Sequence, residues 1–206
     1  MINKAIYFLK SYLQQEAIFS TDDGSVEVGN IGFFEKPTTG DRKLIITLVN
    51  TEEEFTKKNY PFVRKDISEK KAEYKNRSLF LNLYILISAH YGDYDTALKM
   101  LSRTIHCFQA KNVFTASNAT FEGMEDLNDI GLTAKEERKF KLYLDLYTMT
   151  FEQQNHLWGT LGGKQFPSVV YKARLIEIEK EKVHAGGGVV EEIQLSSGSL
   201  AATKPY

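Results

Sequence analysis

The sequence contains very little cysteine and no excess of charge of either sign. Of its 206 residues only Cys107 is a cysteine, so no disulfide can form within the chain. The apolar helical pattern around Cys107 predicts a buried thiol. The 26 Lys and Arg residues are balanced by 27 Asp and Glu residues. Nucleic-acid binders need a basic excess because phosphate contacts dominate their affinity, so the composition predicts no nucleic-acid partner.

Long apolar runs are missing as well. The longest, residues 79–89, is interrupted by Asn82 and Ser88 and is shorter than the roughly 20 residues that span a bilayer. The first residues lack the apolar region and the cleavage site of a signal peptide. These patterns predict a protein that is made and folded in the cytoplasm and does not insert into a membrane.

The sequence also lacks motifs for catalysis, metal binding and phosphate binding. Its histidines do not pair at the spacing of metal ligands; they are His90, His106, His156 and His184. Residues 159–164 resemble a phosphate loop superficially, but Gln165 stands where such a loop has Ser or Thr, and the glycine pair follows a helix. A ligand-binding α/β domain would need converging polar groups, and none is evident. The sequence therefore predicts no enzyme, no cofactor and no metal.

Hydrophobic periodicity predicts a chain that mixes helices and strands. The pattern indicates helices over residues 2–16, 93–108 and 150–161. In the second of these, Ala97, Leu98, Leu101, Ile105 and Phe108 are predicted to line the buried face. Strands are predicted over residues 43–50, 79–89, 138–148 and 169–179, with shorter extended pieces near residues 26–31 and 113–114.

Two stretches differ from the rest in composition. Residues 51–78 carry charges of both signs around Pro61, which predicts a long charged loop. From residue 184 the sequence becomes rich in Gly and Ser, which predicts a flexible tail over 184–206, after a domain spanning 1–183. Part of this tail is strand-prone and could add to a neighbour's sheet edge; its candidate interface residues are Val189, Val190, Ile193 and Leu195.

The strand predicted over residues 138–148 carries two tyrosines on its outer face. Leucines at alternate positions form the predicted core face, and Tyr143 and Tyr147 lie on the opposite one. Aromatic side chains are enriched at protein–protein contacts, so these two are candidate interface residues. A helix packed on that face would explain them equally well.

Residues 157–172 predict a rigid corner between a short helix and a strand. The corner holds the only Trp, the glycine pair that ends the helix, and a proline before the strand. Nothing in it resembles a reaction centre, which favours an assembly component over an enzyme. We expect Trp158 to lie mainly in the core and assign a structural role to four corner residues: Trp158, Gly162, Gly163 and Pro167.

Four segments, in their order and spacing, resemble a known family: residues 2–9, 81–94, 108–115 and 155–175. Together they are similar to the tail-terminator or cap protein of contractile injection systems of the virulence-cassette and antifeeding-prophage type. The resemblance covers about residues 2–180. It implies an α/β (α+β) fold with a mixed, mainly antiparallel sheet and packed helices, like that of phage tail terminators.

The same resemblance implies a non-enzymatic structural protein. Members form a six-fold ring on the distal end of the inner tube and sheath, where they end polymerisation and stabilise the particle. The implied partners are other copies of the chain, in a hexameric ring, and the tube and sheath proteins. The particle is then either released or attached to the cell envelope. Two alternatives stay open: a baseplate- or sheath-associated adaptor of the same machine, and a small ligand-binding α/β domain.

Overall fold

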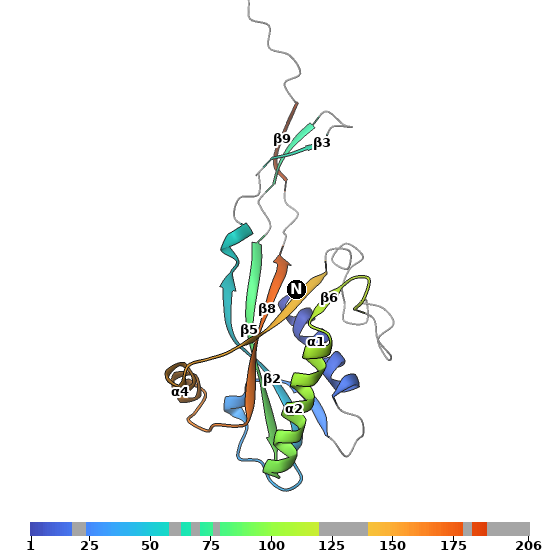
Figure 1. The fold of residues 1–206 in the computed structure, drawn as a ribbon. Coiled ribbons are helices and arrows are strands. Elements are labelled where there is room, and N and C mark those ends of the chain that lie inside the picture. Colours follow the sequence, from blue (N-terminus) through green and yellow to red (C-terminus); the bar gives the residue numbers. More distant parts are fainter. Residues whose placement is uncertain are drawn as a thin grey trace, which may run out of the picture. The chain divides into compact units, whose positions relative to one another are not determined.

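The computed structural model describes residues 1–17, 24–57, 63–66, 71–75, 79–119, 140–178 and 183–188. The chain divides into two compact units. The first comprises Met1–Lys58 and Ser78–Glu179, and the second comprises Asn59–Arg77 and Lys180–Tyr206. The first unit contains a six-stranded sheet and the second a three-stranded sheet (Figure 1).

The larger sheet is mainly antiparallel, as predicted. Only its first pair, β1 with β2, is parallel. The apolar run that the sequence predicted as a strand is β5, which pairs with β2 on one side and β8 on the other. In spatial order the strands are β1 (Ser25–Val28), β2 (Arg42–Glu53), β5 (Leu79–Tyr91), β8 (Ser168–Ile178), β7 (Lys141–Tyr147) and β6 (Val113–Thr115).

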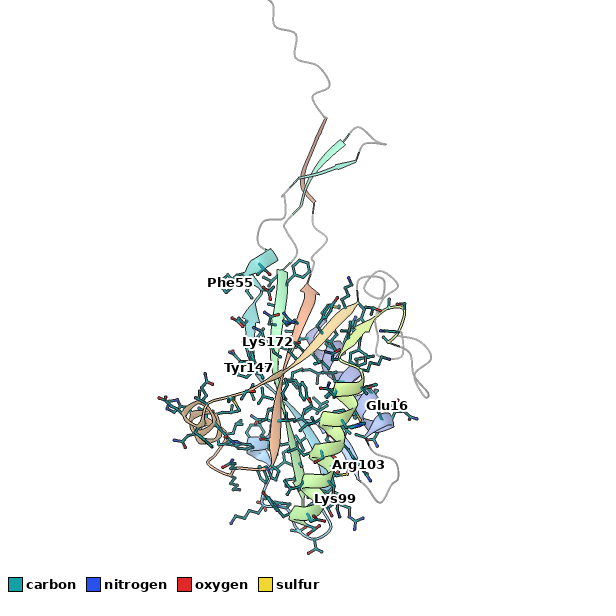
Figure 2. The ribbon with its side chains drawn as sticks, viewed as in Figure 1. Glu16, Phe55, Lys99, Arg103, Tyr147 and Lys172 are labelled. Carbon is teal, nitrogen blue, oxygen red and sulfur yellow. The ribbon has the colours of Figure 1, made fainter. Side chains whose placement is uncertain are left out.

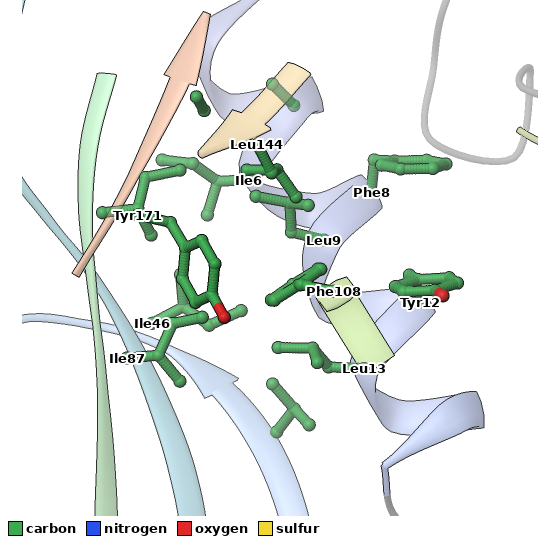
Figure 3. Close-up of a cluster of buried hydrophobic side chains, with 14 of the residues drawn as sticks. Ile6, Phe8, Leu9, Tyr12, Leu13, Ile46, Ile87, Phe108, Leu144 and Tyr171 are labelled. Atoms are coloured by element: carbon green, nitrogen blue, oxygen red, sulfur yellow. The ribbon is translucent and has the colours of Figure 1, made fainter. Parts of the chain in front are cut away.

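Two helices, α1 (Ile2–Glu16) and α2 (Tyr94–Ala110), pack on one face of this sheet and form the main core. Figure 3 shows Tyr171 of β8 pointing toward Phe108 of α2, and the two rings meet edge to face at 4.9 Å. Phe108 in turn stacks on Tyr12 of α1 at 5.9 Å. Aromatic packing therefore joins both helices to the sheet.

The buried face of α2 differs from the predicted one. The helix buries Ala97, Met100, Thr104 and Phe108, whereas Leu98 and Ile105 are 41% and 38% exposed. Both stripes are mainly apolar and both have helical spacing, so periodicity alone could not decide which one meets the sheet. The prediction that Leu98 and Ile105 line the core was wrong for this reason.

A smaller layer covers the opposite face of the sheet and consists of α4 (Phe151–Thr160) and the short helix η2 (Ile31–Phe33). The sequence predicted α4, and a capping box between Thr150 and Gln153 begins the helix in the structure. The helix ends before Gly162 and Gly163, which have positive φ angles of 98° and 74°. The buried residues of this layer are Ile31, Ile45, Leu86, Trp158, Phe166 and Val170.

Amide side chains cap both edges of the larger sheet. On β1, the Val26 N–H donates to the side-chain oxygen of Gln14 at 2.8 Å. On β6, the Thr115 N–H donates to Asn118 at 2.7 Å, and the Asn118 amide donates to the Val113 carbonyl at 3.2 Å. These bonds use backbone groups that face away from the neighbouring strand and would otherwise be open to strand addition.

The second unit corrects two predictions. Residues 51–78 are not one loop, because β2 extends to Glu53 and the segment contains η3 (Phe55–Lys57), β3 (Val63–Asp66) and β4 (Lys71–Lys75). The predicted tail begins inside β9 (Val183–Gly188), which pairs with β4. The charged and glycine-rich sequences of these strands lack the apolar alternation on which strand prediction depends.

The strand order of the small sheet repeats that of the large one. Strand β3 follows β2 in the chain, β4 precedes β5, and β9 follows β8; the two orders are β3-β4-β9 and β2-β5-β8. Among the described residues, no helix is long and apolar enough to cross a membrane.

Candidate assembly surfaces

We call the smaller layer of α4 and η2 the Trp158 layer. Beyond it, the same face of the large sheet is polar. Tyr84 lies two residues before Leu86 on β5, and Lys172 lies two residues after Val170 on β8. Because side chains alternate along a strand, each shares a face of the sheet with its buried neighbour. We call this surface the polar face; it comprises Glu52, Tyr84, Tyr143, Asp145, Tyr147, Lys172 and Arg174. Figure 2 shows Tyr147 and Lys172 on neighbouring strands, β7 and β8.

A network across three strands orders the polar face. The Tyr84 hydroxyl donates to Glu52 Oε2 at 2.8 Å, and Lys172 Nζ lies 3.0 Å from the same oxygen. Lys172 also lies over the Tyr84 ring, 5.2 Å from its centroid. Two hydrogen bonds lower the pKa of the Glu52 carboxyl: the one from Tyr84 has the larger effect, and the one from Lys172 adds to it. Arg174, also on β8, pairs with Asp145 of β7 at 2.5 Å.

The predicted interface tyrosines lie within this surface. Tyr147 meets Tyr84 edge to face at 5.0 Å and also packs against the Trp158 layer. Tyr143 lies opposite Arg174 in the register of β7 and β8 and is half-buried. Their role in an interface stays a prediction. The other candidate interface residues, at positions 189, 190, 193 and 195, lie outside the described residues.

Sequence reasoning missed Glu52, Tyr84 and Lys172. Glu52 and Lys172 are separated by 120 positions along the chain, and only the pairing of β2, β5 and β8 brings them together. No local pattern predicts this contact, because each residue on its own is typical of a solvated polar position.

Glu54, which directly follows β2, has a strongly lowered pKa. The Thr56 hydroxyl donates to its Oε1 at 2.6 Å, and the Asn82 amide donates to Oε2 at 2.9 Å. These bonds, with a further one from the Thr56 N–H, lower the pKa from 4.5 to about 2. The ionised carboxylate is thus the form that the fold stabilises.

This pKa predicts a pH-dependent effect of Glu54→Gln. Because the folded pKa is the lower one, the carboxylate stabilises the protein fully above pH 4.5 and progressively less as the pH falls toward about 2. We expect the variant to melt at a lower temperature than the wild type at neutral pH, and the gap to close over that window. Thermal melts across the pH range measure it. Glu35→Gln, at an exposed position with no such bonds, serves as the control; a Glu54→Gln gap that does not change with pH would contradict the assignment.

The predicted corner separates two hollows in the surface. One, of about 470 Å³, is lined by Lys36, Tyr91, Tyr94, Lys164 and Phe166 among others. The other, of about 300 Å³, lies along α4 and is lined by Phe151, Gln154, Asn155 and Trp158. Gly163 and Gln165 line both. We call the two hollows together the corner groove.

The four corner residues have different environments. Trp158 is 5% exposed, and its ring lies 5.8 Å from that of Phe166. Its indole N–H has no hydrogen-bond partner among the described residues. The Pro167 carbonyl accepts from the Ala89 N–H at 2.9 Å and so attaches the corner to β5. No group of His, Cys, Asp or Glu side chains suited to a metal ion occurs in the described part of the chain.

Residues 6–192 match the Pvc16 N-terminal domain family. The chain belongs to this family. The match confirms the resemblance to tail terminators that the four sequence segments indicated. No curated protein matches the chain in sequence.

Two solved structures share the fold of this Pvc16 N-terminal domain. The first is the sheath/tube terminator of PVC, an extracellular contractile injection system, in its extended state; it is 12% identical, with a TM-score of 0.56. The second is the tube-terminating cap of the anti-feeding prophage, 13% identical with a TM-score of 0.54. The matches cover 98% and 95% of this chain. They cover 63% and 59% of those proteins, so the chain spans less than two thirds of their length.

Proposed function

We propose that this chain is a non-enzymatic terminator of a contractile injection system. In this role it binds the end of the inner tube and sheath, stops their growth and stabilises the particle. One observation carries the proposal: almost the whole chain shares its fold with a sheath/tube terminator and with a tube-terminating cap. The membership of the Pvc16 N-terminal domain family supports it independently.

The proposed assembly is a ring of six copies, with the tube and sheath proteins as further partners. A ring closes when each copy uses two different surfaces, one toward each neighbour. The polar face supplies one ordered surface with fixed charges and tyrosines. We assign the second unit, with the residues after β9, to contacts with a neighbouring copy or the sheath. The protein then folds and assembles in the cytoplasm and ends as part of the particle.

The length of assembled particles tests this function. Particles made without the chain should have tubes and sheaths of widely varying length, whereas particles made with it should have a narrow length distribution. Electron microscopy of purified particles measures both distributions, and labelled protein should appear at one end only. A label at the baseplate end with unchanged lengths would favour the adaptor alternative instead. Re-expression of the wild-type chain is the matched control.

A further inference from the structure

The corner groove contains two chemically different halves. The half along α4 is neutral: its polar side chains are the amides of Gln154, Asn155 and Gln165, and Phe151 stands beside them with 92% of its surface exposed. Such amides donate to and accept from peptide groups, and the lining has no charge that would select an ion. This half therefore fits an extended stretch of polypeptide.

The other half is apolar with a positive rim. Phe166 and Tyr91 are buried beneath it, and Lys36 and Lys164 are exposed beside it. Neither lysine forms an ion pair with a described residue. Both volumes lie in the range of about 300–1,000 Å³ that is typical of ligand pockets. This half fits apolar side chains followed by acidic ones.

We propose that the corner groove binds residues 189–195 of a neighbouring copy of this chain. The segment reads Val-Val-Glu-Glu-Ile-Gln-Leu, in which two acidic residues are flanked by apolar β-branched ones. Glu191 and Glu192 complement the charges of Lys36 and Lys164, and the branched side chains suit the apolar floor. The inference rests on the self-assembly in the proposed function and assigns one contact between neighbouring copies, that of the tail with the groove.

Charge reversal in the full chain tests the pairing. We expect Lys36→Glu with Lys164→Glu to weaken self-association at least tenfold, and Glu191→Lys with Glu192→Lys to do the same. Mixing the two variants should restore association, because each then meets a partner of opposite charge. Analytical ultracentrifugation measures the mass of each sample. Lys99→Glu, at an exposed lysine of α2 that lines neither hollow and lies outside the polar face, is the control and should associate like the wild type.

A labelled peptide supplies a direct readout, even if the free protein is monomeric. The full-length Glu191→Lys, Glu192→Lys variant, whose own tail cannot compete, is titrated with a fluorescein-labelled peptide of residues 187–198. We expect saturable binding by anisotropy. We also expect at least tenfold weaker binding when the receptor carries the two lysine reversals as well, or when Phe151 in it is replaced by Ala.

The outcomes separate this inference from the proposed function. The groove assignment is overturned if the peptide does not bind, or if its affinity is unchanged by the two lysine reversals. Failure of the mixed variants to associate overturns the contact between copies. Particle lengths that still depend on the chain would leave the terminator function standing in either case. Melting temperatures within a degree or so of the wild type would show that the variants are folded.

Discussion

Replacing Phe8 with Ala should lower the free energy of unfolding by about 3–5 kcal/mol, the usual cost of removing a buried Phe. Phe8 of α1 is fully buried. Its ring meets Phe114 of β6 edge to face at 5.0 Å and Phe140 at 5.2 Å. The side chain therefore joins the first helix to the far end of the sheet.

Urea denaturation at equilibrium measures this effect. Tyr7→Ala is the matched control, because Tyr7 precedes Phe8 on the same helix but is 49% exposed. We expect the control to cost less than about 1 kcal/mol, as substitutions of partly exposed side chains usually do. Equal losses for the two variants would show that the Phe8 ring does not hold α1 on the sheet.

Replacing Gly92 with Ala should also destabilise the protein, for a steric reason. A Cβ atom at this position would lie 2.1 Å from the Thr38 carbonyl oxygen and 2.7 Å from the Thr39 Cα. Both are backbone atoms of one turn. The Asp41 carbonyl of the same turn accepts a hydrogen bond from the Gly92 N–H. The turn must therefore move as a unit, at a cost of about 1–3 kcal/mol, and more if the hydrogen bond is lost.

Gly40→Ala provides the control for this substitution, since nothing lies within 4 Å of the Cβ that it would add in the same turn. We expect its melting temperature to match or slightly exceed that of the wild type. Gly92 also lines the corner groove, so Gly92→Ala should weaken peptide binding while Gly40→Ala does not. A Gly92→Ala variant as stable as the wild type would refute the close approach.

Local signals predicted much of the larger unit. The helices predicted over residues 93–108 and 150–161 begin at these positions, because Asp93 and Thr150 cap them through hydrogen bonds to residues only three positions away. The apolar run over residues 79–89 predicted a strand, and β5 is buried along most of its length, because an apolar residue at every position needs cover on each side of the sheet. The buried Trp158 followed from the same kind of local pattern.

Other features depend on pairing across the sheet, which one sequence does not reveal. The strands of the small sheet were missed because residues such as Arg64 and Glu73, which lie opposite each other in its register, read as solvated charges. The corner groove was missed because Lys36 and Lys164 come from distant segments. The corner itself was predicted, but only the fold shows that it separates two hollows.

The amide caps on the sheet edges have a consequence for how this protein behaves before it meets a partner. Many β-proteins form fibres because an open edge on one molecule templates the next without limit. Here the carboxamides of Gln14 and Asn118 occupy backbone groups that such templating would use. Under the proposed function, a subunit that ends one polymer is thereby kept from starting another.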